Sequence, residues 1–239
     1  MNYLREIQLP ELPEDSYVED IPAVRFLHKT GRMRFEAPVT FLVGENGTGK
    51  STLLEAIAVA MGFPAEGGPK EFTYFTKDTH SELSEYLKLV RTNYPEDGFF
   101  LRAESLYNAA SYLEDSGSFL TRYGGVSLHK QSHGESFLAV VTNRFEGNGL
   151  YLLDEPEAAL SPQRQLSLLA AIHELVKKDS QFIIATHSPI LMAYPGAEIK
   201  ELSEGGIRTA PYRETDHYRL TKAFLNDPER MFHYLLEDE

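Results

Sequence analysis

The stretch VTFLVGENGTGKSTLLEAIAVAM, residues 39–61, carries most of the information about the fold. Its first five residues form an uncharged, mostly apolar run, which is typical of a strand buried on both faces of a parallel sheet. Gly44 to Ser51 then match the phosphate-binding pattern G-x-x-x-x-G-K-[ST], and a helical pattern continues to Met61. A strand, a glycine-rich loop and a helix in this order predict an α/β fold with a phosphate site at a strand end.

The residues of this loop meet the requirements for holding a nucleoside triphosphate. Glycines allow the backbone to wrap around phosphate oxygens, and the following helix directs the positive end of its dipole at them. Lys50 is expected to reach the β- and γ-phosphates of ATP, and Ser51 to ligate Mg²⁺. The alternative is a glycine-rich turn that matches by coincidence, which the flanking strand and helix disfavour. The candidate nucleotide-binding residues of this segment are Asn46, Gly47, Thr48, Gly49, Lys50, Ser51 and Thr52.

Two further predicted strands are followed by side chains that can do chemistry. Residues 150–153 form a buried-strand pattern, and Asp154 and Glu155 come directly after it. Asp154 is expected to hold Mg²⁺, directly or through water, and Glu155 to polarise the attacking water as a general base. Taken alone, the two acids fit a solvated pair at a strand end equally well. The strand predicted over 181–186 leads to His187, which is expected to contact the γ-phosphate and that water, although a lone histidine is more often structural.

A weaker signal lies at residues 131–136, QSHGES, ahead of a helix predicted over 134–144. Ser132 and Gly134 at a helix N-terminus form a candidate anion site. Because many helices begin with a serine cap, the same residues also fit an ordinary helix start. The other expected elements are strands at 4–9, 23–27, 33–35, 72–75 and 99–103, helices at 81–91, 105–114, 161–178 and 217–236 (broken near Pro228), and a hairpin at 197–210 with its turn at Gly205-Gly206.

Composition excludes several classes of protein. The 239 residues carry 23 Lys and Arg against 36 Asp and Glu, so the formal charge is −13, which excludes a uniformly basic nucleic-acid-binding surface. The chain has no cysteine, and therefore no disulfide, thiolate metal site or cysteine nucleophile. No run approaches the ~20 apolar residues of a membrane helix, and the first residues, MNYLREIQLPELPED, do not resemble a secretory signal. We therefore expect a soluble cytoplasmic protein without direct membrane insertion.

The ordered set of motifs resembles the ABC-type P-loop ATPases, and within them the soluble SMC/RecF/OLD-like branch of AAA family ATPases. In that resemblance GENGTGKS is the Walker A motif, and residues 150–154 are the Walker B strand. Glu155 stands in the position of the catalytic glutamate, and His187 in that of the switch histidine. The family's signature corresponds to residues 131–135 and its D-loop to 158–161.

The resemblance implies a fold, an activity and a partner. The fold is an ABC-ATPase head, with a mostly parallel sheet flanked by helices, an N-terminal antiparallel β subdomain and a small helical lobe. As a single domain over 1–239 it would divide into 1–38 (β subdomain), 39–63 (P-loop strand and helix), 64–146 (helical lobe ending in the signature helix) and 147–239 (Walker B, switch histidine and C-terminal elements). The implied activity is Mg²⁺-dependent hydrolysis of ATP to ADP and phosphate. The implied assembly is an ATP-dependent homodimer in which Ser132 and Gly134 of one subunit face the P-loop of the other.

This sequence departs from the family pattern at several positions. His133 replaces the first signature glycine, Glu135 replaces the signature glutamine, and Ser161 replaces the D-loop aspartate. Glu104 is the stand-in for the Q-loop glutamine, although an acid in the first turn of a helix is an equally good reading. The segment between Walker A and the signature has only about 80 residues, so no coiled-coil arm fits there.

Three hypotheses address the biological process that ATP serves in this protein. The first is a soluble ATP switch in DNA metabolism or defence, alone or with a partner protein. It relies on the family resemblance and on a local basic cluster, Arg25, His28, Lys29, Arg32 and Arg34, which is equally well explained as a solvated hairpin face. The second is the nucleotide-binding subunit of a membrane ABC transporter, with its membrane spans on another chain. The third is a module that binds ATP without hydrolysing it, which the presence of both Glu155 and His187 disfavours.

Overall fold

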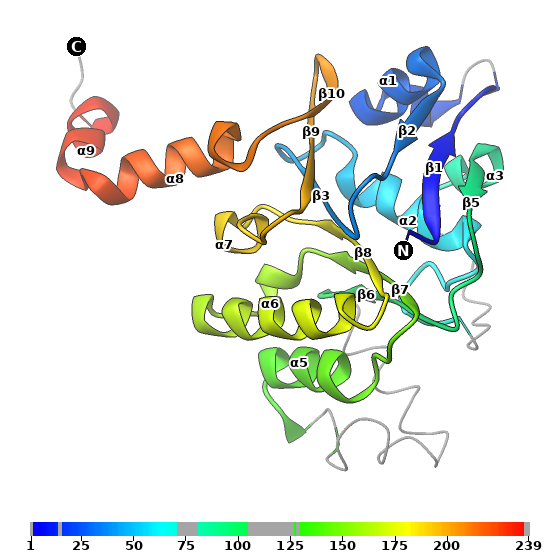
Figure 1. Cartoon of the computed structure of the whole chain (residues 1–239). Helices are drawn as coiled ribbons and strands as arrows, with labels where there is room; N and C mark the ends of the chain where they lie inside the picture. Colours follow the sequence, from blue (N-terminus) through cyan, green and yellow to red (C-terminus); the bar gives the residue numbers. More distant parts are fainter. Residues whose placement is uncertain (1, 14–15, 71–80, 105–126, 128–129, 237–239) are drawn as a thin grey trace.

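A computed structural model of the chain describes residues 2–13, 16–70, 81–104, 127 and 130–236 (Figure 1). Its centre is a seven-stranded β-sheet that is mainly parallel and is flanked by helices. The predicted α/β fold class is therefore confirmed. The strands of this sheet are β3 (Val39–Val43), β4 (Gly68–Pro69), β6 (Asp97–Arg102), β7 (Gly149–Asp154), β8 (Gln181–Ala185), β9 (Glu198–Ser203) and β10 (Gly206–Thr209).

The strand order places the strand of the glycine-rich loop inside the sheet. The order is β10-β9-β3-β8-β7-β6-β4. Neighbours from β9 to β6 pair in parallel, whereas the edge strands β10 and β4 pair antiparallel. β3, β7 and β8 are buried along their whole length, which explains why their sequences are nearly continuous apolar runs.

Helices cover both faces of the sheet (Figure 1). Alternate residues of a strand point to opposite faces, so Phe41 and Leu42 of β3 belong to two different hydrophobic cores. The core around Leu42 includes α1 (Pro22–Thr30), α2 (Lys50–Ala60) and α3 (Leu83–Tyr86). The core around Phe41 includes α5 (His133–Asn143), α6 (Pro162–Val176) and α7 (Pro189–Met192).

A second, antiparallel sheet packs beside α1 and α2. Its strands are β1 (Leu4–Gln8), β2 (Arg32–Arg34) and β5 (Lys88–Arg91), in the order β2-β1-β5. The third strand comes from outside the segment 1–38, so the small sheet is not contiguous in sequence.

The strand expected at 23–27 is wrong, because these residues lie in the helix α1. Pro22 occupies the first turn of the helix, where its missing N–H is tolerated, and Gly31 ends it at a φ of 77°. Val24 and Leu27, three residues apart, are both fully buried on the core side. A five-residue apolar pattern does not distinguish a short strand from one buried face of a helix.

The segment 64–146 differs from a purely helical lobe. The helix expected at 81–91 is reduced to α3, because its last residues pair with β1 as β5. β6 lies in the central sheet, close to the predicted strand 99–103. The strand expected at 72–75 and the helix expected at 105–114 lie outside the described residues.

The C-terminal part follows the expected order of elements. The β9–β10 hairpin turns at Glu204-Gly205, one residue earlier than expected, because Gly206 already pairs with Ser203 as the first residue of β10. β9 also pairs in parallel with β3. The predicted terminal helix is divided at Asp227 into α8 (Asp216–Asn226) and α9 (Pro228–Leu236), which extend away from the sheet as an arm (Figure 1). No residue of the arm is buried. Within the described ranges, none of the helices has the length and apolar character that crossing a bilayer requires.

Candidate nucleotide-binding site

The carboxyl ends of three central strands bring the predicted site residues to one edge of the sheet. Leu42 of β3 is level with Ala185 of β8, and Asp154 of β7 is level with the same Ala185. Three segments therefore begin at the same edge of the sheet: the glycine-rich loop, the acid pair and the segment that ends in His187. This arrangement follows from parallel pairing, which aligns strand ends that are far apart in the sequence.

The loop after β3 approaches the β9–β10 hairpin too closely for a side chain at its first position. Gly44 has a φ of 147°, and a Cβ atom placed there would lie 2.2 Å from the Leu202 carbonyl oxygen. Further along the loop, the Thr48 hydroxyl donates a 2.8 Å hydrogen bond to the Glu45 carbonyl. The loop therefore has a fixed path, held from within and against the neighbouring strand.

Lys50 folds back over this loop and is only 4% exposed. Its ammonium group donates hydrogen bonds to the carbonyl oxygens of Gly44 at 2.8 Å and of Glu45 at 3.0 Å. Burial lowers the pKa of Lys50, while nearby carboxylates act in the opposite direction, that of Glu155 most strongly. The cation is therefore placed inside the loop, where an entering phosphate group can replace the carbonyls as its partner.

Ser51 and Asp154, the two predicted Mg²⁺ ligands, are in contact. The Ser51 hydroxyl donates to a carboxylate oxygen of Asp154 at 2.9 Å. The second oxygen of Asp154 lies 3.4 Å from Nε of Arg102, whose Nη1 binds Glu55 at 2.7 Å. Burial raises the pKa of Asp154 to about 6, against the opposing effects of Arg102 and Ser51.

These donors fit a hard divalent cation. A hydroxyl and a carboxylate on one side of the site leave the remaining positions to water and phosphate oxygens, which is the usual environment of protein-bound Mg²⁺. No group of three or more His, Asp or Glu side chains suited to a metal occurs in the described part of the chain. Ser51 and Asp154 would therefore hold the ion jointly with the nucleotide.

The raised pKa of Asp154 predicts a pH-dependent cost to stability. At pH 7 the folded protein holds this buried carboxylate ionised. As the pH falls through about 6, Asp154 takes up a proton in the folded protein. The free-energy cost of holding it ionised is absent below about pH 4, the pKa of an aspartate in the unfolded chain. A shift of about two pKa units corresponds to roughly 3 kcal/mol of unfolding free energy.

We therefore expect Asp154→Asn to stabilise the protein without nucleotide or Mg²⁺ at pH 7 by roughly 3 kcal/mol, and far less at pH 4.5. Urea unfolding of both proteins in EDTA at the two pH values measures the difference. Because the comparison is between variant and parent, titration of the other acids cancels. An equal effect of the substitution at both pH values would contradict the prediction.

Glu155 has an unusual backbone conformation that directs its side chain. Its φ of 48° and ψ of 53° lie in the left-handed region, which is uncommon for residues with a side chain. Its amide donates to the Ala185 carbonyl at 3.0 Å, which ties it to β8. The carboxylate is 37% exposed and lies 3.7 Å from Nε2 of His187. The predicted base and the predicted histidine therefore face each other.

Glu157 is a site residue that the sequence reading missed. Its carboxylate accepts hydrogen bonds from the Thr186 hydroxyl at 2.7 Å and from the backbone amide of His187 at 2.5 Å. It lies in the 3₁₀ turn η4 (Pro156–Ala158), two residues after Glu155, and burial raises its pKa. The second glutamate of Asp154-Glu-Pro-Glu was the available signal, since it follows a strand end and a turn-forming proline.

His187 has a second partner that no sequence pattern indicated. Its Nδ1 lies 3.0 Å from Nε2 of His217, which belongs to the first turn of α8. The two residues are 30 positions apart, and His217 lies in no motif. Burial lowers the pKa of both imidazoles.

Ser132 and Gly134 lie at the start of α5 and have contacts within this chain. Ser132 is the N-cap of α5, in a capping box with Glu135, and Arg164 of α6 also binds both residues. Gly134 packs against the segment after η4, since a Cβ atom there would lie 2.7 Å from the Ala159 carbonyl. None of the hydrogen bonds among described residues joins Ser132 or Gly134 to the loop at 44–52.

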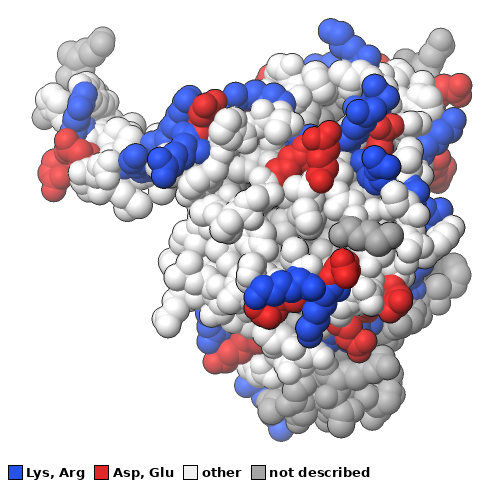
Figure 2. Space-filling view, viewed as in Figure 1, with Lys and Arg blue, Asp and Glu red and all other residues white. Residues whose placement is uncertain are grey.

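The basic cluster proposed for nucleic acid lies on α1 and β2, and not on a hairpin as one reading expected. Several of its members have local partners: Arg34 pairs with Glu6 at 2.9 Å, and His28 lies 3.7 Å from Glu19. Acidic and basic side chains are interspersed over the visible face of the molecule, without one continuous basic region (Figure 2).

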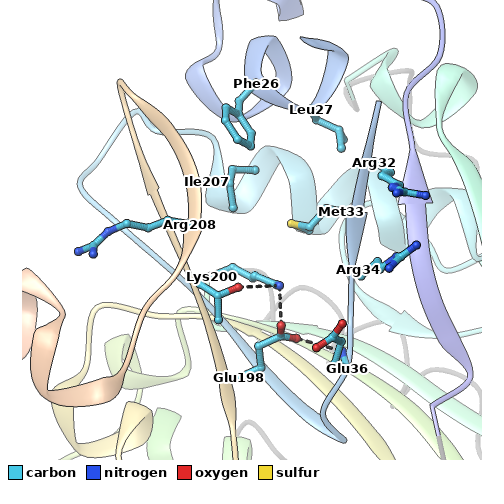
Figure 3. A pocket seen from close by; sticks show the side chains of 11 residues that line it. Phe26, Leu27, Arg32, Met33, Arg34, Glu36, Glu198, Lys200, Ile207 and Arg208 are labelled. Carbon is cyan, nitrogen blue, oxygen red and sulfur yellow. Dashed lines mark hydrogen bonds and ion pairs between the residues drawn. The ribbon is translucent and has the colours of Figure 1, made fainter. Parts of the chain in front are cut away.

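A groove next to this cluster is also mixed in character. Arg32 and Arg34 lie at one side, while Lys200 in its floor is paired with Glu198 at 2.5 Å (Figure 3). Phe26 and Ile207 supply apolar surface. The groove therefore does not form a concentrated phosphate-binding surface.

The chain is similar in sequence to known ATPase domains and ATP-binding proteins. An AAA domain model matches residues 24–118, and an AAA ATPase domain model matches residues 76–192. Xylose import ATP-binding protein XylG of Moorella thermoacetica is 25% identical over 192 residues, which are 71% of this chain and 38% of that protein. Thiamine import ATP-binding protein ThiQ of Haemophilus influenzae is 26% identical over 169 residues, 62% of this chain and 75% of that protein. The chain thus matches well under half the length of the xylose import relative.

A solved structure shows the same fold. An inward-facing ABC transporter, described as of the metal-chelate type, superposes with a TM-score of 0.52 at 15% identity, over 94% of this chain and 90% of that one. The family models and the shared fold agree with the class that the sequence resemblance predicted, the ABC-type P-loop ATPases.

Proposed function

We propose that this chain binds ATP with Mg²⁺ at the carboxyl edge of its sheet and hydrolyses it to ADP and phosphate. The observation that carries the proposal is the convergence of three features at this edge. Lys50 lies inside the phosphate-binding loop, Ser51 contacts Asp154, and the Glu155 carboxylate faces His187. The family models, which are those of ATPases, support the same activity.

Each residue has a distinct task in the proposed reaction. The loop amides and Lys50 would bind and orient the β- and γ-phosphates. Ser51 and Asp154 would hold Mg²⁺, which would neutralise phosphate charge when it is bound. Glu155, partly exposed, would accept a proton from the attacking water, and His187 would hold the γ-phosphate and that water in place.

Release of inorganic phosphate from ATP tests this activity directly. We expect release in the presence of Mg²⁺ and its loss in excess EDTA, with return when Mg²⁺ is restored. Binding of ATP without any Mg²⁺-dependent release would support the alternative of a module that holds ATP unchanged.

We further propose a homodimer that forms with ATP between its subunits. Ser132 lies at an exposed helix start away from contacts with its own loop, so the γ-phosphate on a second subunit is an available ligand for it. Each subunit carries a formal charge of −13, which opposes pairing without a bound ligand that bridges the two. Proximity of one subunit's Ser132 to the partner loop would be lost when the γ-phosphate leaves.

The process coupled to ATP has two candidates. Transport is favoured by the curated relatives, which are import ATP-binding proteins. A cytoplasmic switch in DNA metabolism or defence relies on the resemblance to the soluble branch. The case for direct DNA contact is weakened because Arg34 pairs with Glu6 and His28 lies close to Glu19. Capture of the ATP-trapped Glu155→Gln protein from its own cells separates them, since a transport subunit would retain an integral membrane protein and the switch would retain DNA or a soluble partner.

A further inference from the structure

We propose that His217, in the first turn of α8, is a positioning residue that sets the tautomer of His187. This inference rests on the function proposed above, in which His187 faces the γ-phosphate. The carrying observation is the 3.0 Å separation between Nδ1 of His187 and Nε2 of His217. The ring centroids are 5.2 Å apart and the planes are tilted by 51°, so the two rings meet through their nitrogens and are not stacked.

Two neutral imidazoles at this distance share one hydrogen. Each neutral ring has one N–H donor and one acceptor nitrogen. If His217 donates from Nε2, His187 accepts at Nδ1 and carries its own hydrogen on Nε2. If His187 donates from Nδ1, its Nε2 is a bare acceptor. The contact therefore determines whether His187 can donate a hydrogen bond at the nitrogen that faces the site.

The surroundings favour the first arrangement. Nε2 of His187 lies 3.7 Å from a carboxylate oxygen of Glu155, and an N–H directed at an anion is favourable where a lone pair is not. This Nε2 and the far Nδ1 of His217 are both buried and have no hydrogen-bond partner among the described residues. Nε2 of His187 is thus available to a ligand in the site, such as a phosphate oxygen.

The pair is neutral near pH 7, because burial lowers the pKa of both rings and Lys50 acts in the same direction. Tautomer choice, and not net charge, is then the property that His217 controls. Carboxylates oppose these shifts without being their main cause; they are Glu155 and Glu45 for His187, and Glu45 and Glu201 for His217.

His217 is itself held in place from two sides. Thr215 caps α8 by accepting from the Tyr218 amide at 3.4 Å, and it is fully buried. The amide of Asp216 donates to the Glu201 carboxylate of β9 at 3.2 Å. The start of the arm is therefore fixed to the central sheet, which gives His217 the rigidity that a positioning residue requires.

The tautomer is measured directly by NMR on protein with ¹⁵N-labelled histidine, without nucleotide. We expect the His187 signal, assigned with His187→Ala, to report hydrogen on Nε2 in the parent protein. We expect the fraction of His187 with hydrogen on Nε2 to fall in His217→Leu, because only the Glu155 carboxylate then favours that tautomer. A parent His187 with hydrogen on Nδ1, or an unchanged tautomer in His217→Leu, would overturn the inference, whether or not the chain hydrolyses ATP.

Kinetics separate positioning from a structural role. We expect His217→Leu to lower kcat roughly 10-fold with little change in KM, a size typical of residues that orient a catalytic group. His217→Gln keeps an N–H donor and should restore most of kcat, whereas His233→Leu removes an exposed histidine from the same arm and should have no effect. Equal loss in the Leu and Gln variants, or none in either, would contradict positioning by hydrogen bond. Absence of hydrolysis in the parent would instead refute the proposed function and leave the NMR result standing.

Discussion

Replacing Lys50 by alanine is expected to abolish measurable ATP binding, with a loss in affinity of roughly 100-fold or more. The ammonium group lies inside the glycine-rich loop and donates to two of its carbonyl oxygens. Charge-assisted hydrogen bonds of this kind are about twice as strong as neutral ones, and here burial reduces competition from water. Losing about 3 kcal/mol of interaction with the phosphates corresponds to that factor. Isothermal titration of ATP into the variant measures the change.

A suitable control is Lys177→Ala, which removes an exposed lysine at the C-terminal end of α6 that pairs with Glu174. It should bind ATP as the parent does. Thermal unfolding of both variants shows whether the loop remains folded once its internal cation is gone. If Lys50→Ala binds ATP with unchanged affinity, the assignment of the loop at 44–51 is wrong.

Replacing Glu155 by glutamine is expected to reduce phosphate release by a factor of roughly 100 to 1,000 while ATP still binds. The substitution keeps the size of the side chain and removes the carboxylate that would accept the proton of water. Because the bound triphosphate is then not consumed, we also expect a shift from monomer to dimer in saturating ATP with Mg²⁺. Phosphate release and light scattering measure the two effects on one sample.

The matched control is Glu204→Gln, which makes the same substitution at an exposed residue between β9 and β10. It removes the same unit of negative charge, so a general charge effect on dimerisation would appear there too. A Glu155→Gln protein that remains monomeric in saturating ATP contradicts the proposed dimer. One that releases phosphate at the parental rate contradicts the role of Glu155.

The sequence was most informative where one local stretch contains the whole feature. The strand, loop and helix at 39–61 lie within 23 consecutive residues, and β3 and α2 occupy the expected places. The same holds for β7 and β8, whose apolar runs predicted strands buried on both faces. Alignment of their ends followed from parallel pairing, although the chemical roles of Lys50, Asp154 and His187 remain predictions.

The sequence was least informative where partners are distant. β5 forms a strand because its backbone pairs with β1, which local helical periodicity cannot reveal. Arg102 reaches Asp154, and His217 reaches His187, only because the sheet and the arm bring them together. A single arginine or histidine outside a motif carries no signal of such a contact, so these site residues became visible only in three dimensions.

The left-handed backbone at Glu155 has a consequence for anyone who selects this protein for heat resistance. Glycine adopts that conformation freely, whereas a residue with a Cβ atom is disfavoured there by about 1 kcal/mol. Glu155→Gly should therefore melt at a higher temperature than the parent while losing the carboxylate. A screen that rewards only thermal endurance would enrich inert enzymes at this codon, and would need a parallel assay of turnover to avoid them.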